Sequence, residues 1–97
     1  MNALVLYEVD NQPDAVKKGM IAIGYHTVWM AAGIRYELPN NSLWKPDTTL
    51  EQAYSDINLV VNNVNRLALG SGPFANRVLL IKCIVVSNNP WVGLPSK

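Results

Sequence analysis

Few residues in this chain combine the type and spacing needed for chemistry, and the most suggestive are two acids that close an apolar segment. Glu8 and Asp10 follow Leu4-Val5-Leu6-Tyr7, with one residue between the two carboxylates. Side chains alternate along a strand, so both acids are expected on one face, together with Leu4 and Leu6. Acids at a strand end either belong to a functional site or simply end the strand and cap the next helix. Both interpretations stay open at this point.

The other candidate groups are more simply explained as structural. His26 is the only histidine, and no nucleophile motif surrounds either Ser42 or Cys83, its conceivable partners in a catalytic arrangement. We therefore expect His26 to be a hydrogen-bonded structural residue at a strand start. Cys83 lies in a long apolar run, which predicts a buried and unreactive thiol.

Aromatic side chains are frequent enough to suggest base stacking, but they lack the basic and glycine-rich neighbours of RNA-binding sheets. We expect them to build core or interface. The residues concerned are Tyr7, Trp29, Tyr36, Trp44 and Trp91.

Length and composition restrict the class of protein. The 97 residues suffice for one domain, which we place at 1–97. An apolar fraction of 49% argues against a disordered chain, and a net charge of +1 argues against indiscriminate clamping of duplex nucleic acid. A single cysteine allows no intrachain disulfide, so a reducing cytoplasm is expected. We find no signal peptide and no apolar segment of the ~18–20 residues that span a bilayer, so no membrane partner is predicted.

The hydrophobic pattern predicts six elements in the order strand, helix, strand, strand, helix, strand. Pro13 suits the first turn of the first helix and Gly24 its C-terminal cap. A capping box of Thr48 and Glu51 is expected to start the second helix. The predicted ranges are 3–9, 13–23, 25–38 with a kink or bulge at 31–33, 42–45, 48–69 and 78–86.

This order is that of the ferredoxin-like α+β fold, β-α-β-β-α-β, in which a four-stranded antiparallel sheet carries both helices on one face. The other face is then bare, and we expect Leu4, Leu6 and one alternating set from 78–86 to make it apolar. Such a face usually marks an interaction site, so a homodimer through the open sheet face is predicted. The apolar ending 90–95 is expected to dock on its own sheet or on a partner's.

The chain also resembles a known group. A first strand reading Leu4-Val5-Leu6-Tyr7-Glu8-Val9 that opens a ferredoxin-like domain of this length is similar to the Cas-two-like superfamily. This group contains the small CRISPR adaptation nucleases and the GhoS-type antitoxins that cleave messenger RNA. The segments 38–45 and 83–95 look closest to uncharacterised bacterial members.

The resemblance implies a divalent-metal-dependent endonuclease acting on RNA or DNA. In the CRISPR members, aspartates of two subunits meet near the dimer axis, where this chain has Glu8 in the matching position. Glu8 and Asp10 would then hold a metal such as Mg²⁺, and Arg35 is the candidate for a nearby family arginine. The alternative is a non-catalytic homodimer that works as a regulatory or antitoxin-like interaction module.

Overall fold

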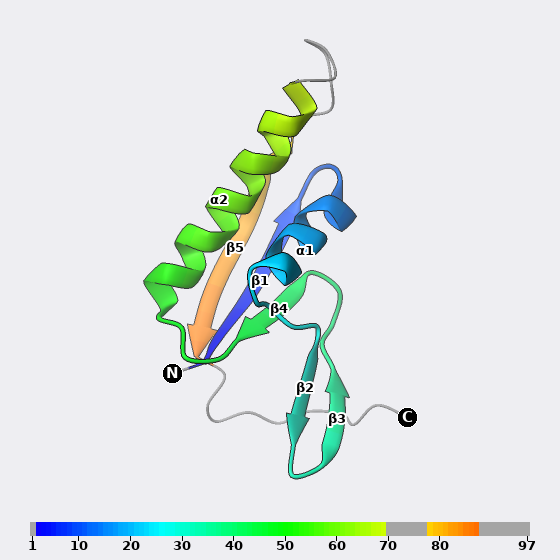
Figure 1. Ribbon diagram of the computed structural model, residues 1–97, viewed down its shortest axis with the longest axis vertical. Helices are drawn as coiled ribbons and strands as arrows, with labels where there is room; N and C mark the ends of the chain where they lie inside the picture. The colour runs from blue at the N-terminus through cyan, green and yellow to red at the C-terminus, as the bar shows by residue number, and fades with distance from the viewer. Residues whose placement is uncertain (1, 70–77, 88–97) are drawn as a thin grey trace.

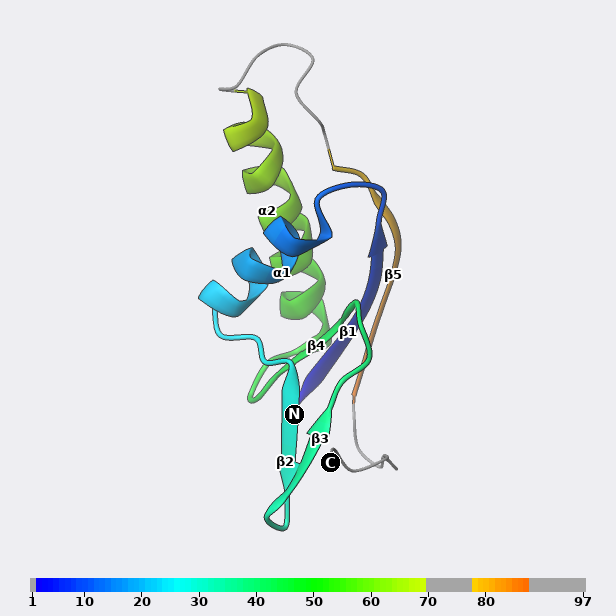
Figure 2. The same ribbon diagram turned by 90° about the vertical axis from the view of Figure 1, so that its right-hand side faces the viewer.

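The computed structural model describes residues 2–69 and 78–87, and it is a small α+β arrangement of antiparallel sheets and two helices. The main sheet has three strands in the order β4-β1-β5, formed by Ser42–Lys45, Ala3–Val9 and Leu80–Ser87. Both helices lie against the same face of this sheet (Figures 1 and 2). The predicted α+β class and the antiparallel pairing are therefore confirmed. The expected docking of residues 90–95 lies outside the described residues.

Alternation along β1 places its side chains as predicted. Ala3, Val5 and Tyr7 are buried beneath the helices, whereas Leu6 and Glu8 are exposed on the opposite face. The strand thus separates a core side from an open side, because successive side chains of a strand point to opposite faces.

Helix α1, Pro13–Ala22, begins with proline and ends in a glycine cap, as its sequence predicts. Gly24 has a φ of 104°, and the amides of Gly24 and Tyr25 bond to the carbonyls of Ile21 and Met20. These two bonds form the Schellman motif, which satisfies the last carbonyls of a helix. Following this cap, Tyr25 is buried in the core. Ile23 lies beyond the last helical residue and is 38% exposed.

The region expected to be one kinked strand is instead a separate two-stranded hairpin of β2, Val28–Ala31, and β3, Ile34–Glu37. Its turn residues Ala32 and Gly33 both have positive φ, the conformation of a type I′ turn that reverses the chain. The prediction of a bulge was therefore wrong. The hairpin projects from the end of the main sheet where β1 begins (Figure 1).

Before the hairpin, one residue pairs through its backbone with the main sheet. His26 and Trp44 form an isolated antiparallel bridge with hydrogen bonds of 2.8 and 3.1 Å between their backbones. The indole Nε1 of Trp44 also donates to the carbonyl of Val28 at 2.7 Å. Within the described residues, the expected second strand of the main sheet is thus reduced to a single bridging residue.

Helix α2, Leu50–Leu69, starts one residue later than its predicted capping box implies. Thr49 accepts the capping hydrogen bond from the amide of Gln52, while the hydroxyl of Thr48 donates to the carbonyl of Pro46. The N-cap is therefore Thr49 and the predicted Thr48–Glu51 box was wrong. Tyr54 is 54% exposed. The residues that α2 buries most completely are Ala53, Asp56, Ile57, Val60 and Val61.

The segment that leads into β5 is held to α2 by one side chain. The amide of Asn65 donates to the carbonyl of Val78 at 2.9 Å, and its oxygen accepts from the amide of Val78 at 2.6 Å. Asn65 thus pairs with the backbone as a neighbouring strand would. Val78 itself is fully buried, and the strand proper begins two residues later, at Leu80.

Candidate functional site

The face of the main sheet that no described helix covers is the candidate functional site, and we call it the open sheet face. Antiparallel partners that stand opposite each other share a face, so the strand register identifies its members. Leu4 pairs with Trp44 on one side and Val86 on the other, and Leu6 pairs with Ile84. The open sheet face consists of Leu4, Leu6 and Glu8 on β1, Ser42 and Trp44 on β4, and Lys82, Ile84 and Val86 on β5, and of these Ser42 is buried.

Apolar side chains on this face are in contact with solvent. Leu6, Ile84 and Val86 are 41%, 63% and 38% exposed, although they belong to adjacent strands of a sheet. The opposite face buries Ala3, Val5 and Tyr7 instead. The expectation that Leu4, Leu6 and an alternating set of β5 make up an apolar open face therefore agrees with the structure.

Aromatic rings extend the open sheet face toward the hairpin. The Trp44 ring lies 5.1 Å from the His26 ring and 4.3 Å from the Trp29 ring, which it meets edge to face. Edge-to-face contacts at this spacing are favourable because the positive ring edge meets the negative ring face. His26 thus joins the main sheet through its backbone bridge to Trp44, while its exposed ring lies beside the Trp44 ring. The rings of Trp29 and Trp44 pack on each other, so they build the surface instead of standing apart as stacking platforms.

Glu8 lies at the far end of the open sheet face and has one charged cross-strand neighbour. It stands directly opposite Lys82, the only charged residue of β5. β4 ends its pairing with β1 at Leu6, so β5 is the one described strand that pairs with Glu8. Opposite charges at directly paired positions stabilise a sheet. The sequence did not indicate this position of Lys82, because the register of β1 against β5 cannot be derived from the pattern of either strand alone.

Asp10 is engaged by the backbone at the start of β5. Its Oδ1 accepts a hydrogen bond of 2.7 Å from the amide of Leu79, and its own amide donates to the carbonyl of Leu79 at 3.2 Å. This pair continues the β1–β5 contact beyond the register shift. The carboxylate thus binds the backbone just before β5 and does not cap α1, which was one of the structural roles expected for a strand-end acid.

Within one chain, Arg35 lies far from Glu8 and Asp10. It lies in β3, where its guanidinium pairs with Glu37 at 3.4 Å on the exposed surface. The hairpin projects from the end of the sheet where β1 begins, whereas Glu8 is close to the end where β1 finishes (Figure 1). The structure therefore places Glu8 and Asp10 near each other and Arg35 at the opposite end.

The fit of a divalent metal to these residues can be tested from the donor set. In residues 2–69 and 78–87, no group of three or more His, Cys, Asp and Glu side chains is arranged to hold a metal ion. Mg²⁺ requires octahedral oxygen ligation, and one oxygen of Asp10 already accepts an amide. Mg²⁺ often completes its octahedral shell with water, so within one chain Glu8 and the second oxygen of Asp10 are the protein groups that would hold it.

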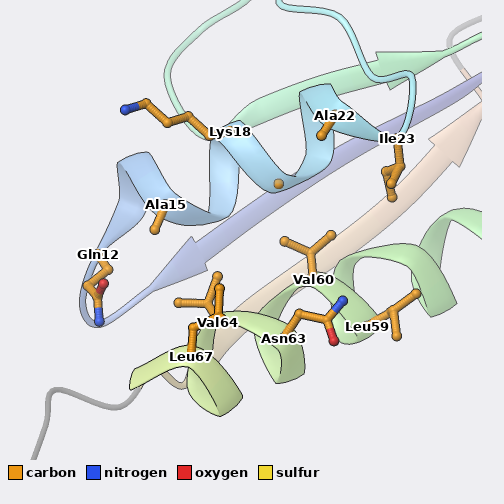
Figure 3. A pocket seen from close by; sticks show the side chains of 11 residues that line it. Gln12, Ala15, Lys18, Ala22, Ile23, Leu59, Val60, Asn63, Val64 and Leu67 are labelled. Carbon is orange, nitrogen blue, oxygen red and sulfur yellow. The ribbon is translucent and has the colours of Figure 1, made fainter. Parts of the chain in front are cut away.

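A groove of about 690 Å³ lies on the helical side, between α1 and α2 (Figure 3). Its walls are small side chains from α1, including Ala15 and Ala22, and apolar ones from α2, including Val60 and Val64. Lys18 points away from the space between the helices. The groove contains none of the predicted site residues, so we do not place the site there.

Comparisons of the chain with protein-family models, with curated proteins and with solved structures give no match. Within the described residues, neither helix is both long and apolar enough to cross a membrane.

Proposed function

We propose that this chain is a cytoplasmic interaction module that forms a homodimer by burying its open sheet face against a second copy. The observation that carries the proposal is the side-by-side exposure of Leu6, Ile84 and Val86. Exposed apolar side chains that adjoin on a sheet mark an interaction site, because their burial removes apolar surface from water. The half-buried thiol of Cys83 fits a reducing compartment.

The ferredoxin-like interpretation supports the same surface. If the His26 bridge is counted as a residual strand, the order across the sheet is β5, β1, β4 and His26, with both helices on one face. This is the order of the β-α-β-β-α-β fold, with the hairpin β2–β3 as an insertion. It is also the arrangement expected for a member of the Cas-two-like superfamily, which the sequence resembles.

The dimer proposal is tested by light scattering after size-exclusion chromatography. We expect the wild type to elute as a dimer at micromolar concentration and Leu6→Asp to elute as a monomer, because a buried carboxylate would lack a partner. Leu59→Asp is the matched control, since Leu59 is a leucine of similar exposure, 52%, on the helical side. A monomeric wild type, or equal loss of the dimer in both variants, would contradict the proposal.

A second candidate function is metal-dependent cleavage of RNA or DNA, and the observation that favours it is the exposed position of Glu8 next to Asp10. In a dimer that brought these acids of both copies together, four carboxylates could hold Mg²⁺ and activate water against a phosphodiester. Arg35 would take part only if a second copy supplied it.

Cleavage is tested with labelled single-stranded RNA and duplex DNA, in Mg²⁺ and in chelator. The most informative variant is the double change Glu8→Gln with Asp10→Asn, which removes both negative charges. Asp10→Asn keeps a side-chain oxygen that can still accept the hydrogen bond from the backbone N–H of Leu79. Cleavage that needs metal and disappears in this variant would establish a nuclease. Cleavage that survives the double change would remove the proposed site, and its absence in the wild type leaves the non-catalytic or antitoxin-like module.

A further inference from the structure

The open sheet face has a charge pattern that is complementary to itself. Three pairs of directly opposed residues run along β1 and β5: Leu4 with Val86, Leu6 with Ile84, and Glu8 with Lys82. The first two pairs are apolar, and the third holds one acid and one base. A two-fold interface places one patch on an identical patch, so it needs this kind of self-complementarity.

The direction of the two-fold axis decides which groups meet. An axis that lies in the open sheet face, parallel to the strands and midway between β1 and β5, stacks β1 of each copy on β5 of the other. Leu6 then covers Ile84, Leu4 covers Val86, and Glu8 meets Lys82 of the second copy. Sheets that pack face to face keep their strands aligned within about 30°, which this axis allows.

An axis perpendicular to the strands at the level of Glu8 gives a different contact. It places Glu8 of one copy on Glu8 of the other, and Lys82 on Lys82. Like charges in a dry interface are costly unless a bound ion compensates them. This second axis is the one that a metal site shared between the copies would require.

We infer that the dimer uses the axis parallel to the strands, so that Glu8 of each copy pairs with Lys82 of the other. The inference rests on the proposed homodimer and specifies its geometry. The occupant is a second copy because the face carries one acid and one base, whereas a phosphate backbone would require an excess of positive charge. Glu8 then selects the partner and its register instead of binding a metal.

A mixing experiment isolates contacts between copies from the pair within each chain. Glu8→Lys places an ammonium group at both positions 8 and 82 of every chain, and Lys82→Glu places a carboxylate at both. Neither variant can therefore form the opposite-charge pair within one chain. Homodimers of each variant place like charges together, whereas the mixed dimer restores two opposite-charge contacts. With one variant labelled in ¹⁵N, native mass spectrometry counts the three species.

We expect the mixed dimer to exceed the half of all dimers that random pairing gives. The excess should shrink in 1 M salt, where the Debye length is about 3 Å. The control mixture is Lys18→Glu with Glu51→Lys, since both residues are exposed on the helical elements, and it should pair randomly. An axis perpendicular to the strands also favours this mixed dimer, so a second mixture, of wild type with the double variant Glu8→Lys, Lys82→Glu, decides the axis. The parallel axis places like charges together in that mixed dimer, which should fall below half of all dimers, whereas the perpendicular axis places opposite charges together and raises it above half. An excess in this second mixture, or random pairing in both mixtures with a stable wild-type dimer, would overturn the parallel axis and leave the dimer intact.

A monomeric wild type would overturn the dimer and the axis together, and two further measurements then identify what covers the face. A shift of labelled single-stranded RNA would indicate a nucleic acid. Dimerisation on removal of residues 88–97 would indicate that the chain's own ending occupies it. These outcomes all begin from a monomeric wild type, so they can be told apart from a failure of the axis, in which the wild type is still a dimer.

Discussion

The hydroxyl of Tyr25 donates a hydrogen bond of 2.8 Å to Oδ2 of Asp56, a residue 31 positions later in the chain. Both side chains are buried, and Oδ1 of Asp56 accepts a second hydrogen bond of 2.8 Å from the side chain of Gln52. The contact joins the cap of α1 to the middle of α2. It therefore holds α1 and α2 together over one face of the main sheet, and the opposite face is the open sheet face (Figure 2).

Removal of this hydroxyl is expected to destabilise the fold. Tyr25→Phe keeps the ring but leaves Asp56 Oδ2 buried without its donor, which costs about 1–3 kcal/mol of unfolding free energy. Urea denaturation followed by circular dichroism measures the loss. Tyr54→Phe is the matched control, because Tyr54 lies on the exposed side of α2 and its hydroxyl should contribute little. Equal stability of wild type and Tyr25→Phe would contradict the role of this hydrogen bond.

The same tyrosine predicts how stability depends on alkaline pH. Burial raises the pKa of Tyr25 above its usual value near 10, and the hydrogen bond and charge of Asp56 raise it further. Above pH ~10 the unfolded chain has released this proton and the folded chain still holds it. The unfolding free energy contributed by Tyr25 is therefore fully present below that pH and falls as pH rises above it.

Comparison of wild type and Tyr25→Phe between pH 8 and 11 isolates this effect from the titration of lysines. We expect a shallower decline in the variant. Some decline should persist, since burial, followed by the charge of Asp14, raises the pKa of Tyr7 as well. Parallel curves for the two proteins would rule out the proposed contribution of Tyr25.

Asn65 provides a third prediction, because its amide makes both hydrogen bonds to the backbone of Val78. Asn65→Ala leaves a buried amide and carbonyl without partners, at a cost of about 1–3 kcal/mol. Hydrogen exchange at the Val78 amide should accelerate more than exchange at the centre of β5. Asn65→Asp keeps the acceptor for that amide and should retain most of its protection. Unchanged exchange in Asn65→Ala would show that Asn65 does not hold this segment.

The elements that the sequence predicts well are those with a single strong pattern. Alternation in β1 identifies Val5 and Tyr7 as core and Leu6 as open-face, because one buried face is enough to fix which side chains point inward. Pro13 and Gly24 bound α1 for equally local reasons. Local conformational preferences suffice wherever tertiary contacts do not compete with them.

The parts that the sequence does not predict depend on distant contacts. Ala32 adopts a positive φ that non-glycine residues seldom take, so a type I′ hairpin was not expected at this position. Thr48 turns its hydroxyl to Pro46, which leaves capping to Thr49. The pairing of Glu8 with Lys82 depends on the register of β1 against β5, which brings together residues 74 positions apart in the chain. For the candidate site, the acids were found from the sequence and their basic neighbour was not.

Cys83 is predicted to react slowly in the folded protein. It lies on the core side of β5, opposite Tyr7, and burial raises the pKa of its thiol. The thiolate is the reactive form, so less of it is present at pH 8 than in the unfolded chain. Labelling with a chromogenic disulfide should accelerate at least about tenfold in urea, as expected if reaction requires opening of the fold. A rate in buffer equal to that in urea would show that the thiol is accessible.

Gly19 is predicted to be required for the close approach of α1 to α2. A Cβ at this position would lie 2.6 Å from Cγ1 of Val60, a β-branched side chain with little freedom to move. Gly19→Ala gains about 1 kcal/mol of helix propensity but overpacks the contact, which costs about 1–3 kcal/mol, so we expect a net loss of stability. Val60→Ala removes the obstructing methyl groups. In that background Gly19→Ala should become neutral or stabilising, a coupling that a double-mutant cycle in urea measures directly. The same effect of Gly19→Ala in both backgrounds would show that Val60 is not what restricts this position.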